Sequence, residues 1–81
     1  MSAAADAMAD MARRLEGMVE ELTDMALDAL RRATSGDPDS LEAGEALATE
    51  RRIVRARRAL EKSITVLEEG AGHQRDGDGG P

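Results

Sequence analysis

Apolar residues recur every three or four positions through the first part of the chain. The series consists of Met8, Met11, Leu15, Met18, Leu22, Met25 and Ala29. This is the spacing of a helix that packs one seam against another helix. Four further residues lie beside the seam and widen it to the stripe that a bundle helix buries: Ala12, Val19, Ala26 and Ala33. The pattern predicts a helix over residues 3–34.

A short polar segment, SGDPDS, interrupts this pattern. Gly36 suits the position just past a helix, and Pro38 cannot continue one. The sequence allows two starts for a following helix. Asp39 can cap it together with Glu42 three residues later, or Asp37 can cap it with Pro38 as the first helical residue.

The same spacing returns after the turn and predicts a second helix over residues 39–69. Its apolar positions are Ala43, Ala46, Leu47, Ile53, Val54, Leu60, Ile64 and Leu67. Two charged residues, Glu50 and Arg57, fall on the same seam. They either form a buried ion pair, within one molecule or between two, that sets the register at a cost in stability, or they reach the edge of the seam through a small rotation of the helix.

Two long helices joined by a short turn predict an all-α fold, an antiparallel helical hairpin over residues 1–69. Residues 70–81 are rich in glycine and polar residues, so we expect a disordered tail there. A hairpin of this length without cysteine needs another source of stability. We therefore expect a homodimer that forms a four-helix bundle. Its core seam would combine Met8, Met11, Leu15, Met18, Leu22 and Met25 of the first helix with Leu47, Ile53, Leu60, Ile64 and Leu67 of the second.

The segment ERRIVRARR is basic in a chain whose net charge is -6. Folding the hairpin about residue 37 places Glu16 beside Arg58, so the acidic part of the first helix would complement the arginine cluster. Such pairs set register, although each exposed pair contributes only about 0–1 kcal/mol. The residues predicted to take part are Glu16, Glu20, Glu21, Glu50, Arg51, Arg52, Arg55, Arg57 and Arg58.

Composition argues against several function classes. The chain has no aromatic residue to stack on bases and its net charge is negative, so nucleic-acid binding is not expected. No apolar run approaches the roughly 20 residues that span a bilayer, and the N-terminus lacks the apolar core of a secretory signal. Together with the absence of cysteine, this favours a cytoplasmic protein.

The candidate chemistry is sparse. His73 is the only histidine and lies in the expected tail, near Asp76 and Asp78. No serine or threonine of the helices has a histidine to activate it, so a nucleophile–base pair is missing. We expect no enzymatic activity, no metal site and no cofactor.

One succession of motifs carries a family resemblance. It runs from LEGMVEELTDMALDAL through a short turn to DPDSLEAGEALATERRIVRARRALEKSITVL, over roughly residues 15–67. This resembles one repeat of the PhoU-type phosphate-uptake regulators, which implies a regulator of a transporter or kinase. That family binds metal through an acid followed four residues later by Asp. Here Glu50 matches the acid, but Val54 takes the second place, so metal binding is not implied. The family has two three-helix repeats per chain, so this chain would be a reduced, dimerising relative.

We therefore expect a non-catalytic protein that acts through self-association and protein–protein contacts, as an adaptor, a regulator or a structural component. One alternative is a PhoU-like regulator. Another is an accessory subunit of a nucleic-acid-processing enzyme that uses the arginine-rich face. LEGMVEEL followed by SGD and LEA is also similar to the exonuclease VII small subunit, although the tyrosine-containing motif of that family is missing.

Overall fold

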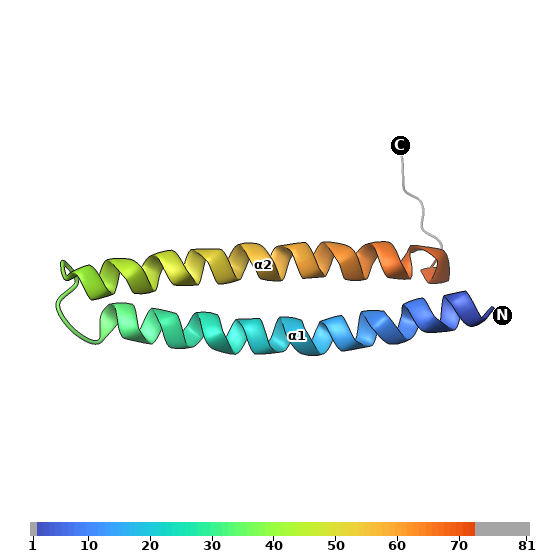
Figure 1. Ribbon diagram of the computed structural model, residues 1–81, viewed down its shortest axis with the longest axis horizontal. Helices are drawn as coiled ribbons and strands as arrows, with labels where there is room; N and C mark the ends of the chain where they lie inside the picture. The colour runs from blue at the N-terminus through green and yellow to red at the C-terminus, as the bar shows by residue number, and fades with distance from the viewer. Residues whose placement is uncertain (1, 73–81) are drawn as a thin grey trace, which may run out of the picture.

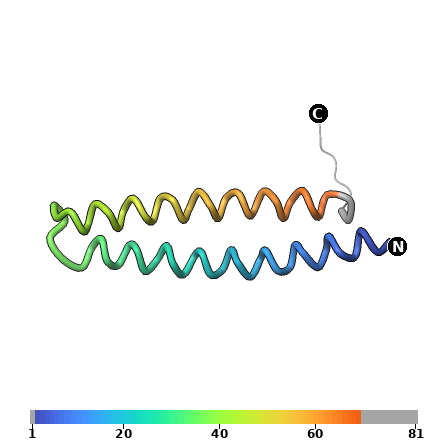
Figure 2. Tube along the Cα trace, viewed as in Figure 1, coloured from blue at the N-terminus to red at the C-terminus, as the bar shows by residue number. Residues whose placement is uncertain are grey.

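The two helices lie side by side as an antiparallel pair joined by a short turn (Figure 1). The computed structural model describes residues 2–72, in which α1 spans Ala3–Thr34 and α2 spans Leu41–Gly72. This part of the chain contains no strand. The two helices remain adjacent along nearly their whole length (Figure 2). The expected all-α helical hairpin is confirmed.

The second helix differs from its predicted bounds at both ends. It begins two residues later than expected and continues through Gly72, three residues into the segment expected to be a tail. The other part of that predicted tail, residues 73–81, lies outside the described residues. His73, Asp76 and Asp78 lie there as well.

The cap of α2 is Ser40, so both predicted caps are wrong. The Ser40 hydroxyl accepts a hydrogen bond from the backbone N–H of Ala43 at 3.0 Å. Asp37 instead organises the turn, because its carboxylate accepts from the N–H of Asp39 at 2.9 Å and its carbonyl from the N–H of Ser40 at 3.1 Å. Aspartate favours both turns and caps. With Asp37 used in the turn around Pro38, α2 begins at Leu41, and Ser40, directly before it, supplies the cap.

The contact between α1 and α2 is lined mainly by alanine. The buried apolar residues of the described chain are Ala12, Ala26, Ala29, Ala33, Ala43 and Ile64. Alanine allows two helix backbones to approach closely, but each methyl group removes little surface from water. The hairpin by itself therefore has a thin core, with Ile64 as its one large buried side chain in this part of the chain.

The seam of α1 lies beside the one predicted from the methionines. The residues of α1 that face α2 are Ala12, Leu15, Val19, Leu22, Ala26, Ala29 and Ala33, all buried or half-buried. The four predicted methionines, Met8, Met11, Met18 and Met25, are 43–51% exposed. The apolar stripe of α1 is wide enough to contain two overlapping series of residues, each spaced three and four positions apart. The alanine-rich series forms the hairpin contact, because its small side chains allow the closer approach.

Candidate functional site

One side of the hairpin carries a continuous apolar surface, which we call the methionine face. Leu22 and Met25 of α1 line one groove of about 350 Å³ with Ile53 and Ala56 of α2. Met11 and Met18 precede Met25 by whole heptads, so they continue the same side of α1. The face consists of Met8, Met11, Leu15, Met18, Leu22 and Met25 on α1, with Thr49, Ile53, Ala56 and Leu60 on α2.

The methionine face contains six of the seven side chains that the α1 pattern predicts as a core seam, and the hairpin leaves its four methionines about half exposed. Its methionines expose between 43 and 51% of their surface. Monomeric proteins rarely expose a large contiguous apolar patch, and such patches mark binding surfaces. Leu15 and Leu22 are half-buried, because they lie between the seam and this face. The methionine face is therefore the strongest candidate for an interaction site.

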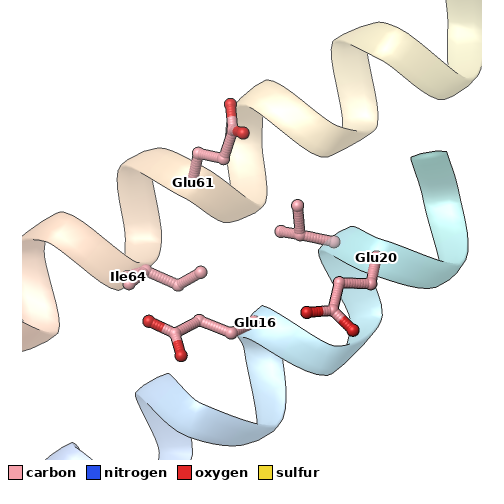
Figure 3. A pocket seen from close by; sticks show the side chains of 5 residues that line it. Glu16, Glu20, Glu61 and Ile64 are labelled. Atoms are coloured by element: carbon pink, nitrogen blue, oxygen red, sulfur yellow. The ribbon is translucent and has the colours of Figure 1, made fainter.

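The opposite side of the hairpin holds an acidic groove (Figure 3). Its volume is about 370 Å³, and its lining is Glu16, Val19 and Glu20 of α1 with Glu61 and Ile64 of α2. Glu20 follows Met18 by two residues, or about 200° around the helix, which places the groove away from the methionine face. In the part of the chain that the structure describes, no three acidic or imidazole side chains are arranged to hold a metal ion.

The lining of this groove shows that the charged residues of α1 and α2 are aligned differently from the prediction. Folding about residue 37 predicts Arg58 beside Glu16, whereas the structure places Glu61 there. The two helices are therefore displaced by nearly one turn from that estimate, because the alanine and isoleucine contacts set their relative height. Glu16 and Glu20 line a groove with another carboxylate, and in the described part of the chain neither forms an ion pair with the arginine cluster.

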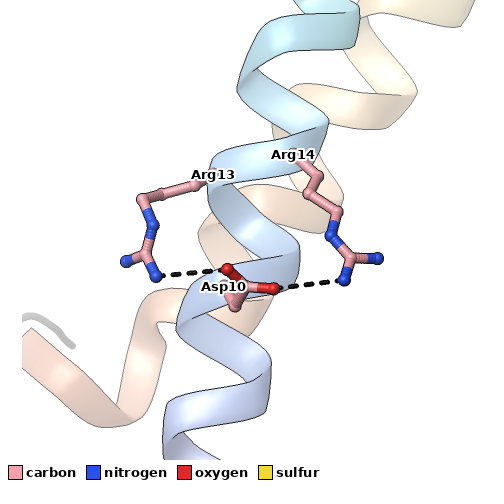
Figure 4. A network of polar contacts seen from close by, with 3 residues as sticks. All are labelled: Asp10, Arg13 and Arg14. Carbon is pink, nitrogen blue, oxygen red and sulfur yellow. Dashed lines mark hydrogen bonds and ion pairs between the residues drawn. The ribbon is translucent and has the colours of Figure 1, made fainter.

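The ion pairs of the described residues all lie within α1. Asp10 pairs with Arg13 at 3.3 Å and with Arg14 at 3.2 Å (Figure 4). Asp28 pairs with Arg32 at 2.7 Å. These are exposed pairs three or four residues apart, each contributing about 0.3–0.5 kcal/mol. No ion pair joins α1 to α2 between residues 2 and 69. The remaining predicted register residues on the surface are Glu21, Arg51, Arg52, Arg55 and Arg58, all exposed.

Two charged residues, Glu50 and Arg57, were predicted either to form a buried ion pair or to reach the edge of the seam. Within one hairpin, the structure matches neither expectation. Glu50 and Arg57 are both half-buried, but they form no ion pair within the molecule. The Arg57 guanidinium reaches α1 and donates from Nη1 to the Thr23 hydroxyl oxygen at 3.2 Å. Its Nε is buried and has no hydrogen-bond partner. Pairing of Arg57 with Glu50 of a second molecule stays a prediction.

Replacing Arg57 by methionine should leave the protein as stable as before or stabilise it by about 1 kcal/mol. The change removes a half-buried charge with an unpaired Nε and keeps an apolar side chain in the seam. Thr23 keeps a partner, because its hydroxyl also donates to the Val19 carbonyl at 3.0 Å. Urea denaturation at one protein concentration measures the effect, with Arg58→Met as the exposed control. A loss of more than about 1 kcal/mol would show that Arg57 has a strong partner outside the hairpin.

A second apolar patch lies on the acidic-groove side, nearer the turn. We call it the leucine–arginine face; it consists of Leu27, Leu30, Leu47 and Val54, flanked by Arg51 and Arg58. Leu30 follows Glu16 by two heptads and Leu47 precedes Glu61 by two heptads, so both continue the rows that line the acidic groove. The three leucines are 37–47% exposed. The sequence pattern alone does not reveal this patch, because Leu47 also fits the predicted seam.

Two further findings concern the kind of protein this is. In the part of the chain that the structure describes, neither helix combines the length and the apolar character needed to cross a bilayer. The resemblance to PhoU-type regulators stays a hypothesis, since it rests on the quoted motifs alone. No protein-family model, no curated protein and no solved structure matches the chain.

Proposed function

We propose that this protein is a non-catalytic helical interaction protein that self-associates through its methionine face, two hairpins forming a four-helix bundle. It acts as an adaptor or regulator through the surfaces that the bundle leaves exposed. One observation carries the proposal. The buried core of the hairpin is five alanines and one isoleucine, while the four methionines beside it stay about half exposed. A second copy would bury this face and complete a core of ordinary size.

The dimensions of the side of the hairpin that carries the methionine face support this proposal. A 32-residue helix is about 48 Å long, and two adjacent helices are roughly 20 Å wide. That area exceeds the roughly 800 Å² per partner of a standard protein–protein interface. Methionine adapts its shape to a facing surface and fills irregular gaps between helices. This side of the hairpin therefore has the size of a dimer interface, and the methionine face on it has suitable side chains.

The experiment that tests the proposal is size-exclusion chromatography with light scattering and circular dichroism. We expect a helical species of twice the 8.6 kDa chain mass at micromolar concentration. A fully helical monomer under the same conditions would contradict the proposal.

The exposed arginines favour a second candidate function, that of an accessory subunit of a nucleic-acid-processing enzyme. Arg51, Arg55 and Arg58 are exposed and make no ion pair with α1. Arginines of this kind can contact phosphates, and such binding weakens steeply with salt.

Retention on a heparin column tests this second candidate. If nucleic acid is the partner, the protein should be retained at low salt, and the triple variant Arg51→Ala, Arg55→Ala, Arg58→Ala should elute much earlier. The variant Arg13→Ala, Arg14→Ala, Arg31→Ala is the control, because it removes the same charge from α1. Equal elution of both variants would assign any retention to general charge and remove this candidate.

A further inference from the structure

We infer that the second copy covers the methionine face with both turns at the same end of the dimer, so that α1 of each copy lies on α2 of the other. This arrangement rests on the proposed self-association and specifies its geometry, its register and the charged residues that meet across it.

The first support is the shape of the face. On α1, Met11, Met18 and Met25 form a row of large, flexible side chains one heptad apart. On α2, the matching row is Thr49, Ala56 and Ser63, which are small. Two grooves of about 350 and 330 Å³ lie between the rows, and Met25, Thr49 and Ile53 line both. The face is therefore a ridge beside a depression.

Two symmetric dimers can cover such a face, and only one matches the ridge with the depression. A two-fold axis parallel to the helices lays the methionine ridge of each copy on the small-residue row of the other. A two-fold axis perpendicular to the helices lays ridge on ridge, with Met18 against the partner's Met18, and leaves the small rows opposite one another. Helix interfaces pack large side chains into holes. Shape complementarity therefore favours the parallel axis, which puts both turns at one end.

Charge supports the same arrangement. A parallel two-fold axis keeps every residue at its own height along the bundle. Asp28 lines a groove with Thr49 and Ile53, and Arg52 lines the adjoining groove with the same two residues. Asp28 and Arg52 therefore lie within about one helical turn of each other in height, on the outer edges of α1 and α2. In the same-end dimer, these edges lie over one another, and Asp28 of one copy faces Arg52 of the other.

A second pair of opposite charges meets closer to the turn. Arg32 lines a groove with Glu42 and Glu45, so it lies within about one helical turn of the height of Glu45. In the same-end dimer, Arg32 therefore faces Glu45 of the other copy. In the opposite-end dimer, α1 would lie on α1 and α2 on α2, so Arg32 and Glu45 would not meet. Interface charges of this kind select one orientation more than they add affinity.

Cysteine cross-linking between separately tagged copies tests the arrangement. The natural chain has no cysteine, so each engineered thiol is unambiguous. A disulfide needs Cβ atoms about 3.5–4.5 Å apart. We expect Met25→Cys copies to link to Thr49→Cys or Ala56→Cys copies, and Met18→Cys copies not to link to one another. Using separate copies prevents a disulfide within one hairpin.

The outcomes separate this inference from the proposed function. A helical monomer in light scattering removes both. A dimer in which Met18→Cys links to itself, or in which neither mixture links, keeps the self-association and overturns the same-end arrangement.

Charge reversal gives an independent measurement. Asp28→Arg should raise the dimer dissociation constant about tenfold, because it places like charges together at two symmetric sites. The double variant Asp28→Arg, Arg52→Asp should return to within about threefold of the natural protein. The intrahelical pair of Asp28 with Arg32 is lost in both variants, so it cannot account for the recovery. Failure of the double variant to recover would overturn the pairing.

Discussion

Replacing Met18 by lysine should convert the proposed dimer into a monomer at micromolar concentration. The variant introduces a charge at two symmetric places in the middle of the proposed interface, where burying it without a partner is costly. We expect the dissociation constant to rise by roughly a hundredfold or more, since each tenfold step corresponds to about 1.4 kcal/mol. Light scattering over a range of concentrations measures the change, and circular dichroism shows whether the helices persist.

The matched control for this variant is Leu27→Lys. Leu27 is 47% exposed in the hairpin and Met18 is 49% exposed, so surface burial alone does not distinguish them. Methionine, leucine and lysine also have similar helix propensities. Leu27 belongs to the leucine–arginine face, and its replacement should leave the mass at that of a dimer. Dissociation by Leu27→Lys with a dimeric Met18→Lys variant would move the interface to the other side of the hairpin.

Replacing Ile64 by alanine should cost about 2–4 kcal/mol of unfolding free energy. Ile64 is 9% exposed and is the one large side chain among the buried residues of the described chain. In a domain of this size, each kcal/mol lowers the melting temperature by about 4–8 °C. We therefore expect melting more than about 10 °C below that of the natural protein, followed by circular dichroism.

Val66→Ala is the control for this second change. Val66 lies two residues from Ile64 on the same helix but is 54% exposed. Its replacement removes little buried surface, and the higher helix propensity of alanine offsets part of that loss. Its effect should stay below about 1 kcal/mol. Equal destabilisation by both variants at one protein concentration would show that Ile64 does not anchor the seam.

The helices themselves follow from local patterns. The three–four spacing from Met8 to Ala33 requires a helix, and the SGDPDS segment requires a break, because Gly36 and Pro38 oppose helix continuation. The cap was harder to predict, since three residues of this segment can accept a hydrogen bond from a helix N-terminus. Asp37, Asp39 and Ser40 compete, and the turn geometry around Pro38 selects Ser40.

The candidate site follows from the sequence only in part. The α1 residues of the methionine face were predicted as one apolar series, whereas Thr49 and Ala56 of α2 were not predicted. A stripe as wide as that of α1 can turn either of its edges toward α2. The charge pattern was a poorer guide to the axial register of α1 against α2. Glu16 lies beside Glu61 and not beside Arg58, because exposed ion pairs contribute little and close packing of alanines contributes more.

The sequence by itself determined two long helices, the turn between them and the apolar residues that need cover, because spacing along the chain and turn chemistry act over a few residues. Only the tertiary structure decided which edge of the apolar stripe of α1 packs against α2. It also decided the axial register between the two helices. Those choices depend on the fit of side chains from both helices at once, such as Ile64 in the seam and Arg57 against Thr23. The same fit leaves Met11, Met18 and Met25 in one exposed row for a second copy to cover.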